Sequence, residues 1–358
     1  MGFGRLGASG GGGGLSGAVV VAFLKRSIAW YDFDPLTGVA FQEAAASTPA
    51  ATVGDPLGAW LDRFRRDVPA TQATAGFRPL LGRTVKGGRR NLFLDTENHA
   101  ATTWVKTTTT VSDDGATAPS GAVAYKIYAD ASPPLLSKQL IISAAQVTYS
   151  FYIKKGSGAT QANRYIAKDN TTGDILIQWR INFDTGVITY DPVTMTQQAG
   201  LTVEALGSGA YYVRHTITTV PGRQYRFFLG FMGGSTSIGE YSYLGEVQVE
   251  EGGEATPYQA IGATVADVTE IGKDTLWYAS FDQIDDALAV PVPDLGTDAV
   301  VAYADENGVT ILEGQTISTS YPLITSAQLF ALAIYDDPLT SAEKNAIRSI
   351  MNPLTEAL

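Results

Sequence analysis

The sequence contains no cysteine and only two histidines. Without cysteine the chain can form neither a disulfide framework nor a thiolate metal site. The histidines, His99 and His215, have no second ligand at the spacing that a zinc site requires. His99 lies in a loop beside a glutamate, whereas His215 lies in an alternating segment, which favours a structural imidazole. The sequence therefore gives no support for zinc or thiolate chemistry.

Charge is scarce as well. Charged residues make up 17% of the chain, and 36 acidic residues against 25 basic ones give a net charge of −11. Such a chain is a poor partner for nucleic-acid phosphates or anionic lipid, but it can bind a neutral sugar. The apolar run Ala18–Leu24 is far shorter than the ~20 residues that span a bilayer. We therefore expect no nucleic acid and no membrane insertion, and we interpret this run as a buried strand or a contact with another chain.

Two catalytic motifs are missing. The sequence has no Gly-x-Ser-x-Gly turn for an activated serine and no Gly-x-x-x-x-Gly-Lys phosphate loop. Paired carboxylates across a cleft, as in glycosidases, remain as an enzymatic option. The acidic residues that could form such a pair are Asp282, Asp285 and Asp286 in one turn, and Glu246, Glu250 and Glu251 near a strand end. We interpret the three aspartates as solvated turn carboxylates and Glu250 with Glu251 as a solvated strand end, and we predict that the chain is not an enzyme.

The aspartates of the first group have a second interpretation. Asp282, Asp285 and Asp286 could hold a structural Ca²⁺ through their carboxylate oxygens. We expect no other cofactor.

What the sequence has in quantity is glycine, 38 residues, together with short alternating runs of β-branched and aromatic residues. These runs predict strands at Thr102–Val111, Val123–Tyr128, Val147–Ile153, Ile175–Phe183, Val187–Tyr190, Tyr211–Val220, Tyr225–Met232 and Leu244–Val249. Hairpin turns are predicted at Asp184-Thr185-Gly186 and Pro221-Gly222. We expect the last strand to close the sheet. Strands at regular spacing without intervening helices predict a mainly β fold of jelly-roll β-sandwiches.

One short helix is predicted at the C-terminus. Thr340 and Glu343 have the spacing of a capping box. The apolar residues Ala342, Ala346, Ile347 and Ile350 then share one helix face, and Pro353 is expected to end the helix.

The outer parts of the chain resemble the concanavalin-like, or laminin-G-like, jelly rolls of phage structural proteins. The residues that carry this resemblance are Trp30-Tyr31-Asp32, Trp60-Leu61-Asp62, Ala70-Thr71-Gln72-Ala73-Thr74, Arg78-Pro79 and, much later, Phe281-Asp282-Gln283-Ile284-Asp285-Asp286. In the family pattern the last of these directly follows the Arg-Pro, and it has glycine where this chain has Gln283. The split predicts an insertion, so that residues 27–85 and 262–352 form a host domain around a separate module at 91–258.

The ends of the inserted module carry a second resemblance. Asn91-Leu92 with Thr96-Glu97, a tryptophan at Trp104, Ala118-Pro119 and the closing Val247-Gln248-Val249-Glu250 with Ala255-Thr256-Pro257-Tyr258 are similar to the carbohydrate-binding-module-like jelly rolls of phage fibre and spike proteins. The resemblance implies a sandwich that binds sugar or acts as a spacer. Sugar binding of this kind needs aromatic residues whose rings can stack on a pyranose. Among Trp104, Trp179, Tyr211, Tyr212, Tyr241 and Tyr243, we predict Trp104, Tyr241 and Tyr243 as glycan-binding and Trp179 as core.

Residues 1–26 are interpreted as a glycine-rich attachment arm. Gly10–Gly14 form a flexible tether by composition, and Phe3 and Leu6 at its tip could become ordered only against a partner. A simple tail is the alternative.

Three functions follow as hypotheses. The preferred one is a bacteriophage virion protein, a tail or terminal fibre or spike subunit. It would attach by its N-terminal arm, form a homotrimer and present a β-sandwich to host cell-surface polysaccharide. The alternatives are a capsid-surface decoration protein, or head fibre, without a receptor role, and a polysaccharide-degrading tailspike enzyme.

Overall fold

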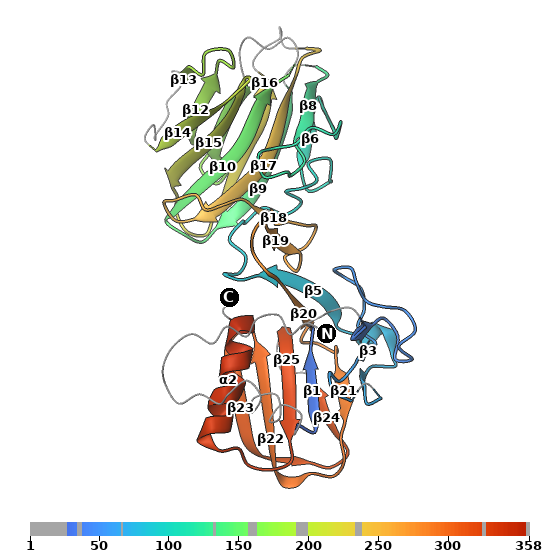
Figure 1. Cartoon of the computed structure of the whole chain (residues 1–358). Coiled ribbons are helices and arrows are strands. Elements are labelled where there is room, and N and C mark those ends of the chain that lie inside the picture. Colours follow the sequence, from blue (N-terminus) through green and yellow to red (C-terminus); the bar gives the residue numbers. More distant parts are fainter. Residues whose placement is uncertain are drawn as a thin grey trace. The chain divides into compact units, whose positions relative to one another are not determined.

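The computed structural model describes residues 27–33, 38–65, 67–131, 134–156, 163–190, 200–232, 238–323 and 327–355. The expected attachment arm, residues 1–26 with Phe3 and Leu6, lies outside the described residues. Within them the fold is mainly β with one C-terminal α-helix, as predicted (Figure 1). No helix among the described residues is long and apolar enough to cross a membrane.

The chain divides into two compact units. The outer unit contains the described residues up to Gly88 and those from Lys273 onward, and the inner unit is Arg89–Gly272. The sequence placed the return to the outer domain at residue 262, which is too early. Residues from 262 to 272 stay with the inner unit because strand β18 (Gln259–Ile261) pairs with β19 (Val268–Glu270). The carbonyl groups of Gly262 and Ile261 accept the backbone N–H groups of Asp95 and Thr96.

The outer unit contains two antiparallel sheets. The first has the order β23-β22-β25-β20-β5, with β1 also paired to β25. Its strands are β1 (Ala29–Asp32), β5 (Leu80–Val85), β20 (Thr275–Ser280), β22 (Gly296–Asp305), β23 (Gly308–Ile317) and β25 (Gln328–Tyr335). The second has the order β2-β3-β4-β21-β24. Its strands are β2 (Ala40–Phe41), β3 (Ala59–Trp60), β4 (Ala70–Thr71), β21 (Leu288–Pro291) and β24 (Ser320–Leu323), and a 3₁₀ turn, η1, spans Ala75–Phe77.

The two sequence motifs of this unit that combine a tryptophan with an aspartate, Trp30-Tyr31-Asp32 and Trp60-Leu61-Asp62, have a structural cause. The ring of Phe33 stacks on Trp60 with centroids 4.2 Å apart, in the core between the sheets. The carboxylate of Asp32 accepts the indole N–H of Trp30 at 2.7 Å, and Asp62 accepts the backbone N–H of Trp30 at 2.8 Å. Each aspartate therefore satisfies a buried donor that a tryptophan residue brings into the core.

The C-terminal helix α2 (Ser341–Thr355) packs beside β22, β23 and β25. The predicted capping box is present, because Glu343 accepts the backbone N–H of Thr340 at 2.8 Å and Thr340 Oγ1 accepts that of Glu343. The helix buries Ile347 and Met351. The expectation that Pro353 ends the helix is wrong by two residues. A proline close to the end removes only one intrahelical donor, so the last turn persists.

The inner unit is a jelly-roll sandwich of two six-stranded antiparallel sheets (Figure 1). Sheet one has the order β14-β15-β10-β17-β8-β7, with β7 (Thr109–Ser112), β8 (Tyr125–Ala129), β10 (Gln146–Lys155), β14 (Leu201–Gly207), β15 (Ala210–Thr218) and β17 (Tyr241–Glu251). Sheet two has the order β13-β12-β11-β16-β9-β6, with β6 (Val105–Thr107), β9 (Leu135–Ile142), β11 (Asn163–Asp169), β12 (Ile175–Ile181), β13 (Ile188–Tyr190) and β16 (Arg223–Met232).

The alternating strands build the core between these sheets. Tyr165 of β11 stacks on Trp179 of β12 at 4.4 Å, and Phe151 of β10 approaches Tyr165 from the opposite sheet at 4.9 Å. All three rings are fully buried. The prediction of Trp179 as a core residue is confirmed.

Three details of the predicted strand pairing are wrong. The single strand expected at Thr102–Val111 is two strands in different sheets, because the backbone turns at Thr108 with a φ of +46°. The segments around Pro221-Gly222 do not form a hairpin, since β15 and β16 also lie in different sheets. Strand β17 is internal, between β10 and β8, and does not close the sheet. The predicted β12–β13 hairpin is confirmed.

Candidate glycan-binding face

Four tyrosines gather on the outward side of sheet one of the inner unit, which we call the tyrosine face: Tyr152 of β10, Tyr212 of β15, and Tyr241 and Tyr243 of β17. On β10 the neighbours of Tyr152 point into the core, and the same holds for Tyr212 on β15. Because successive side chains on a strand point to opposite sides, both tyrosines point outward. They lie directly opposite each other in the register of the two strands.

The other two tyrosines meet edge to face. The ring centroids of Tyr241 and Tyr243 are 5.6 Å apart, with the planes at 87°. Lys126 Nζ lies 4.0 Å from the Tyr241 ring centroid. Tyr243 has Lys154 and Lys126 as register partners on its two neighbouring strands, and its hydroxyl donates to Asp114 Oδ2 at 3.0 Å. Aromatic rings and hydrogen-bonding groups thus alternate across three strands.

Further polar groups border Tyr212. The Arg214 guanidinium lies 5.0 Å from the Tyr212 ring centroid, and its Nη2 is 3.6 Å from Glu204 Oε2. Ser150 of β10 is the register partner of Arg214 and accepts the Tyr212 hydroxyl at 3.5 Å. The side chains of Arg214 and Glu204 are about half exposed, 47% and 56%, so both can exchange this pairing for a ligand.

The segment between β7 and β8 folds over part of the face. Its residues Ala118 and Ala124 pack against Tyr152, which is 5% exposed as a result. Tyr212, Tyr241 and Tyr243 remain only partly buried. Close packing requires a glycine on β17 opposite Tyr152, since a Cβ at Gly245 would lie 3.1 Å from the Val123 carbonyl oxygen. Tyr152 therefore supports the face, and the other three tyrosines form its accessible part.

The tyrosine hydroxyls keep their protons. Burial and the hydrogen bond with Asp114 raise the pKa of Tyr243 to about 12. Burial also raises the pKa of Tyr152 and Tyr212, with a further contribution from the charge of Glu246. At neutral pH all three are uncharged hydroxyls that can donate a hydrogen bond.

A cavity of about 320 Å³ lies elsewhere in the inner unit. It is lined by Glu97, Ser120, Gly121, Ala122, Tyr258, Ala260, Thr269, Glu270 and Ile271. The Tyr258 hydroxyl contacts Glu97 Oε1 at 2.9 Å, and Glu270 Oε2 accepts Arg90 Nη2 at 2.7 Å. None of its lining residues belongs to the tyrosine face.

The structure corrects the expectation for Trp104. This ring is 2% exposed, and it packs against Phe93 at 5.6 Å and His99 at 4.7 Å. Its indole N–H donates to the Asp95 carbonyl at 3.0 Å. A sugar cannot stack on a ring that is enclosed in the core. For Tyr241 and Tyr243, glycan binding stays a prediction, although both lie within β17 and not in a loop.

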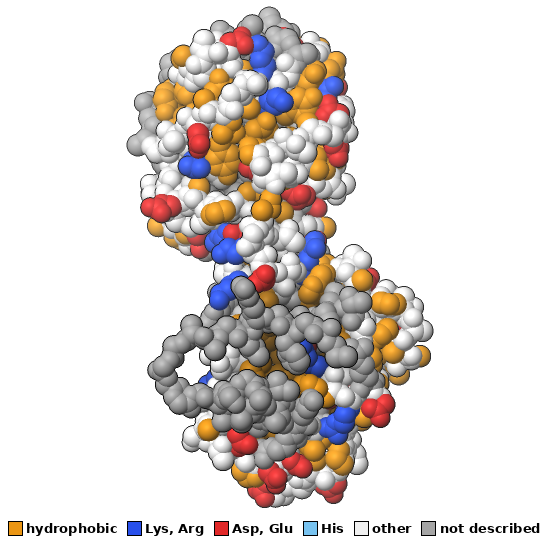
Figure 2. Space-filling model, viewed as in Figure 1, with side chains coloured by type: hydrophobic (Ala, Val, Ile, Leu, Met, Phe, Trp, Pro, Cys, Tyr) orange, Lys and Arg blue, Asp and Glu red, His pale blue; other side chains and the backbone are white. Residues whose placement is uncertain are grey.

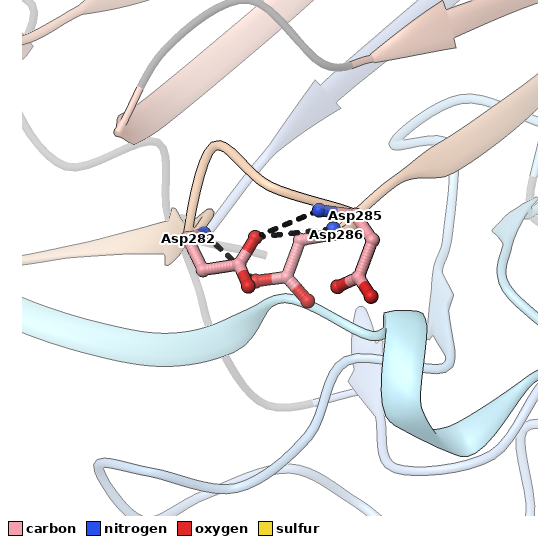
Figure 3. Close-up of side chains that lie close together, drawn as sticks. All are labelled: Asp282, Asp285 and Asp286. Atoms are coloured by element: carbon pink, nitrogen blue, oxygen red, sulfur yellow. Dashed lines mark hydrogen bonds between the residues drawn. The ribbon is translucent and has the colours of Figure 1, made fainter.

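The three aspartates of the outer unit do meet in space (Figure 3). One carboxylate oxygen from each of Asp282, Asp285 and Asp286 lies within 4.8 Å of the others. However, Asp282 Oδ1 accepts the backbone N–H groups of Ile284, Asp285 and Asp286, and Asp286 Oδ2 accepts that of Asp282. These bonds lower the pKa of Asp282 and account for the turn without a metal. The structural Ca²⁺ stays a prediction.

Two of the candidate glutamates are buried, including Glu250, which was expected in solvent. Glu246 is 4% exposed, and its Oε1 accepts the Ser120 backbone N–H at 2.7 Å. Glu250 is 3% exposed and accepts the backbone N–H of Thr256 at 2.9 Å. The chain folds back over β17 in these places, which alternation within one strand does not reveal. Glu251 is exposed, as expected.

Both histidines are fully buried in the inner unit. His215 stacks on Tyr149 at 5.4 Å, in agreement with a structural imidazole, and burial lowers its pKa to about 4. His99, expected in a loop, lies between Trp104 and Tyr125. Burial is the main cause that lowers the pKa of His99 to about 3. Both rings are neutral at physiological pH.

Comparisons with known proteins identify no family. No protein-family profile and no curated protein matches the sequence. Among solved structures, the chain is similar to the CBM22-1 xylan-binding domain of Paenibacillus barcinonensis Xyn10C, with 13% identity, 49% of this chain and 94% of that domain covered, and a TM-score of 0.28. The CBM22-1–CBM22-2 tandem of the same protein is 12% identical, with 72% of this chain and 93% of the tandem covered, and a TM-score of 0.30. The enzymatically active domain of bacteriophage CBA120 tailspike protein 4 is 12% identical, with 45% of this chain and 21% of that chain covered, and a TM-score of 0.25. Scores at this level establish no shared function.

Proposed function

We propose that the inner unit binds a polysaccharide through the tyrosine face. We further propose that the chain is a bacteriophage virion structural protein, a tail or terminal fibre or spike subunit, that presents this unit to the host surface. The observation that carries the binding proposal is the gathering of Tyr212, Tyr241 and Tyr243, partly exposed, on three strands of one sheet face. The virion role is supported by the sequence resemblance to phage fibre and spike proteins.

The chemistry of the face suits a sugar polymer. The apolar side of a pyranose ring packs on an aromatic side chain, while its hydroxyls need donors and acceptors close by. Here the tyrosine rings supply the apolar contacts, and Lys126, Lys154 and Arg214 supply donors. Figure 2 shows hydrophobic side chains gathered in the middle of the visible face of the inner unit, with Lys and Arg side chains among and beside them. An extended sheet face can contact several sugar units at once.

Affinity electrophoresis of the full chain in gels that contain host-surface polysaccharide tests this proposal. We expect retardation, and we expect Tyr212→Ala with Tyr243→Ala to weaken it about tenfold, the loss of one to two stacking contacts. Phe228→Ala is the matched control, because this partly buried aromatic lies on the outward side of the other sheet. Equal retardation of the double variant and the control would refute the tyrosine face as the binding surface.

The virion role is tested separately. A phage whose gene for this chain lacks residues 1–24 should yield a folded protein that is missing from purified particles, because the arm is the proposed attachment element. Normal incorporation of the shortened chain would refute the attachment role. Visualisation of the labelled full chain on particles by electron microscopy separates a tail position from the capsid position of the head-fibre alternative.

A further inference from the structure

The cavity of the inner unit combines a sugar-sized volume with charge of one sign. Its volume is about 320 Å³, and its charged lining residues are Glu97 and Glu270, with neither lysine nor arginine. The charge of Glu270 is compensated, since its Oε2 accepts Arg90 Nη2 at 2.7 Å. Within the described residues Glu97 makes no ion pair. Its carboxylate accepts a hydrogen bond from the Tyr258 hydroxyl.

A second carboxylate adds to this negative charge. Glu246 Oε1 accepts the backbone N–H of Ser120, a residue that lines the cavity. Among the described residues Glu246 also makes no ion pair. The charges of Glu246 and Glu97 interact unfavourably. Buried carboxylates normally have a cationic partner, because transfer of an unpaired charge out of water is costly. Glu246 is buried and Glu97 is partly buried, and among the described residues neither has a cationic partner.

We propose that this cavity is a second binding site, separate from the tyrosine face, that takes the primary ammonium group of an amino sugar. The ammonium supplies the positive charge that the wall lacks and donates to Glu97. Thr269 and the Ser120–Ala122 turn also line the cavity and supply polar groups beside Glu97, and Ala260 and Ile271 supply apolar ones. That the ammonium belongs to a sugar rests on the proposed function.

The pKa of Glu97 agrees with a site whose negative charge has no cationic partner among the described residues. Burial, followed by the charge of Glu246, raises the pKa of Glu97, whereas the Tyr258 hydrogen bond lowers it. Two further titratable groups lie near Glu97: Tyr125, whose hydroxyl donates to the Glu97 backbone carbonyl at 2.8 Å, and Glu270, which lines the same cavity. A bound ammonium would reverse the shift. Complex formation should therefore release a proton at pH values where free Glu97 is partly protonated.

Calorimetry of the full chain with two tetrasaccharides tests the proposal. One is a tetramer of glucosamine with free amines, and the other is the same tetramer with every amine acetylated. At pH 6 we expect the free-amine tetramer to bind at least about tenfold more tightly. We expect Glu97→Gln to remove this preference. Glu254→Gln, the same charge change at an exposed position of the inner unit, should preserve it and so excludes general attraction to an acidic chain.

A second variant covers the case in which Glu97→Gln fails to fold. Ile271 is 67% exposed at the cavity, so Ile271→Lys should fold and place a competing ammonium at the site. Binding of the free-amine tetramer should then fall at least about tenfold. Equal affinity for the two tetramers, or unchanged affinity in Ile271→Lys, overturns the proposal. Loss of polysaccharide retardation in the tyrosine variants, measured alongside, would show that the tyrosine face functions even if this cavity does not bind an amine.

Discussion

Tyr152 and Tyr212 are register partners on neighbouring strands of one sheet face, yet Tyr152 is covered by another part of the chain and buried, whereas Tyr212 is only partly buried. The coverage comes from the segment between β7 and β8, which places Ala118 and Ala124 on the Tyr152 ring. One tyrosine is thus part of the packing of the unit, and its partner is part of the accessible surface. The two should respond differently to the same substitution.

Tyr152→Ala should lower the free energy of unfolding by about 3 kcal/mol, since it leaves a cavity beneath the covering segment. Tyr212→Ala should cost less than about 1 kcal/mol, because water can occupy the vacated space, but it should weaken polysaccharide binding. Urea unfolding gives the first quantity, and affinity electrophoresis gives the second. If both variants lose stability equally, the distinction between supporting and accessible tyrosines is wrong.

The second prediction concerns Arg90, which lies between two buried carboxylates. Its Nη2 is 2.7 Å from Glu270 Oε2, and its Nε is 3.6 Å from Glu250 Oε1. Arg90→Ala leaves both carboxylates without their cation, so we expect a loss of about 3 kcal/mol. Arg214→Ala is the control, because its half-exposed pair with Glu204 should contribute less than about 0.5 kcal/mol. A loss below 1 kcal/mol for Arg90→Ala, by urea unfolding, would contradict this.

The third prediction concerns acid sensitivity. Burial lowers the pKa of His215 to about 4, whereas an unfolded histidine titrates near 6.5. As the pH falls below 6.5 the unfolded chain takes up the proton first, so the stability that neutral His215 contributes is complete above that pH and is lost below it. The loss at pH 5 is about 2 kcal/mol.

His215→Phe should abolish this part of the pH dependence. Neither ring nitrogen of His215 has a hydrogen-bond partner within the described residues, so phenylalanine leaves no polar group unsatisfied. We expect the difference in unfolding free energy between pH 7 and pH 5 to shrink by about 2 kcal/mol. His99 remains as a second acid-sensitive group in the variant. An unchanged difference would mean that His215 does not titrate as proposed.

The fourth prediction is that the chain does not degrade polysaccharide. Incubation of the purified protein with host-surface polysaccharide should release no reducing ends above background. The aspartate turn bonds its own backbone, and Glu250 is enclosed by Thr256 and Arg90. A release that disappears in Asp282→Ala or Glu250→Ala would favour the tailspike-enzyme alternative.

Local patterns predicted the parts of the fold that depend on neighbouring residues. Alternation identified β12 and the core position of Trp179, and the spacing of Thr340 and Glu343 identified the start of α2. Strand order was not accessible in this way, because β15 pairs with the distant strand β10 as well as with the preceding strand β14, and not with the next strand, β16. Pairings of that kind depend on contacts between distant residues.

The candidate site shows the same limit. Alternation places Tyr152 and Tyr212 opposite the core-facing residues, so this signal was available for both. It could not show that the segment between β7 and β8 buries Tyr152 and leaves Tyr212 partly exposed. The prediction for Trp104 failed for a related reason. This residue lies just before β6, so alternation along a strand could not indicate whether its side chain is buried. Only folding brings the Asp95 carbonyl to its indole N–H.

The contacts of Arg90 have a consequence for how the inner unit is connected to the rest of the chain. Arg90 lies one residue after the start of the unit and Glu270 two residues before its end, and the two are joined by a 2.7 Å ion pair. The incoming and outgoing chain are therefore joined by an ion pair between residues of the unit itself, in addition to the pairing of β5 with β20 in the outer unit. Because the ion pair belongs to the inner unit, it holds the two ends of this unit together independently of the residues that precede and follow them.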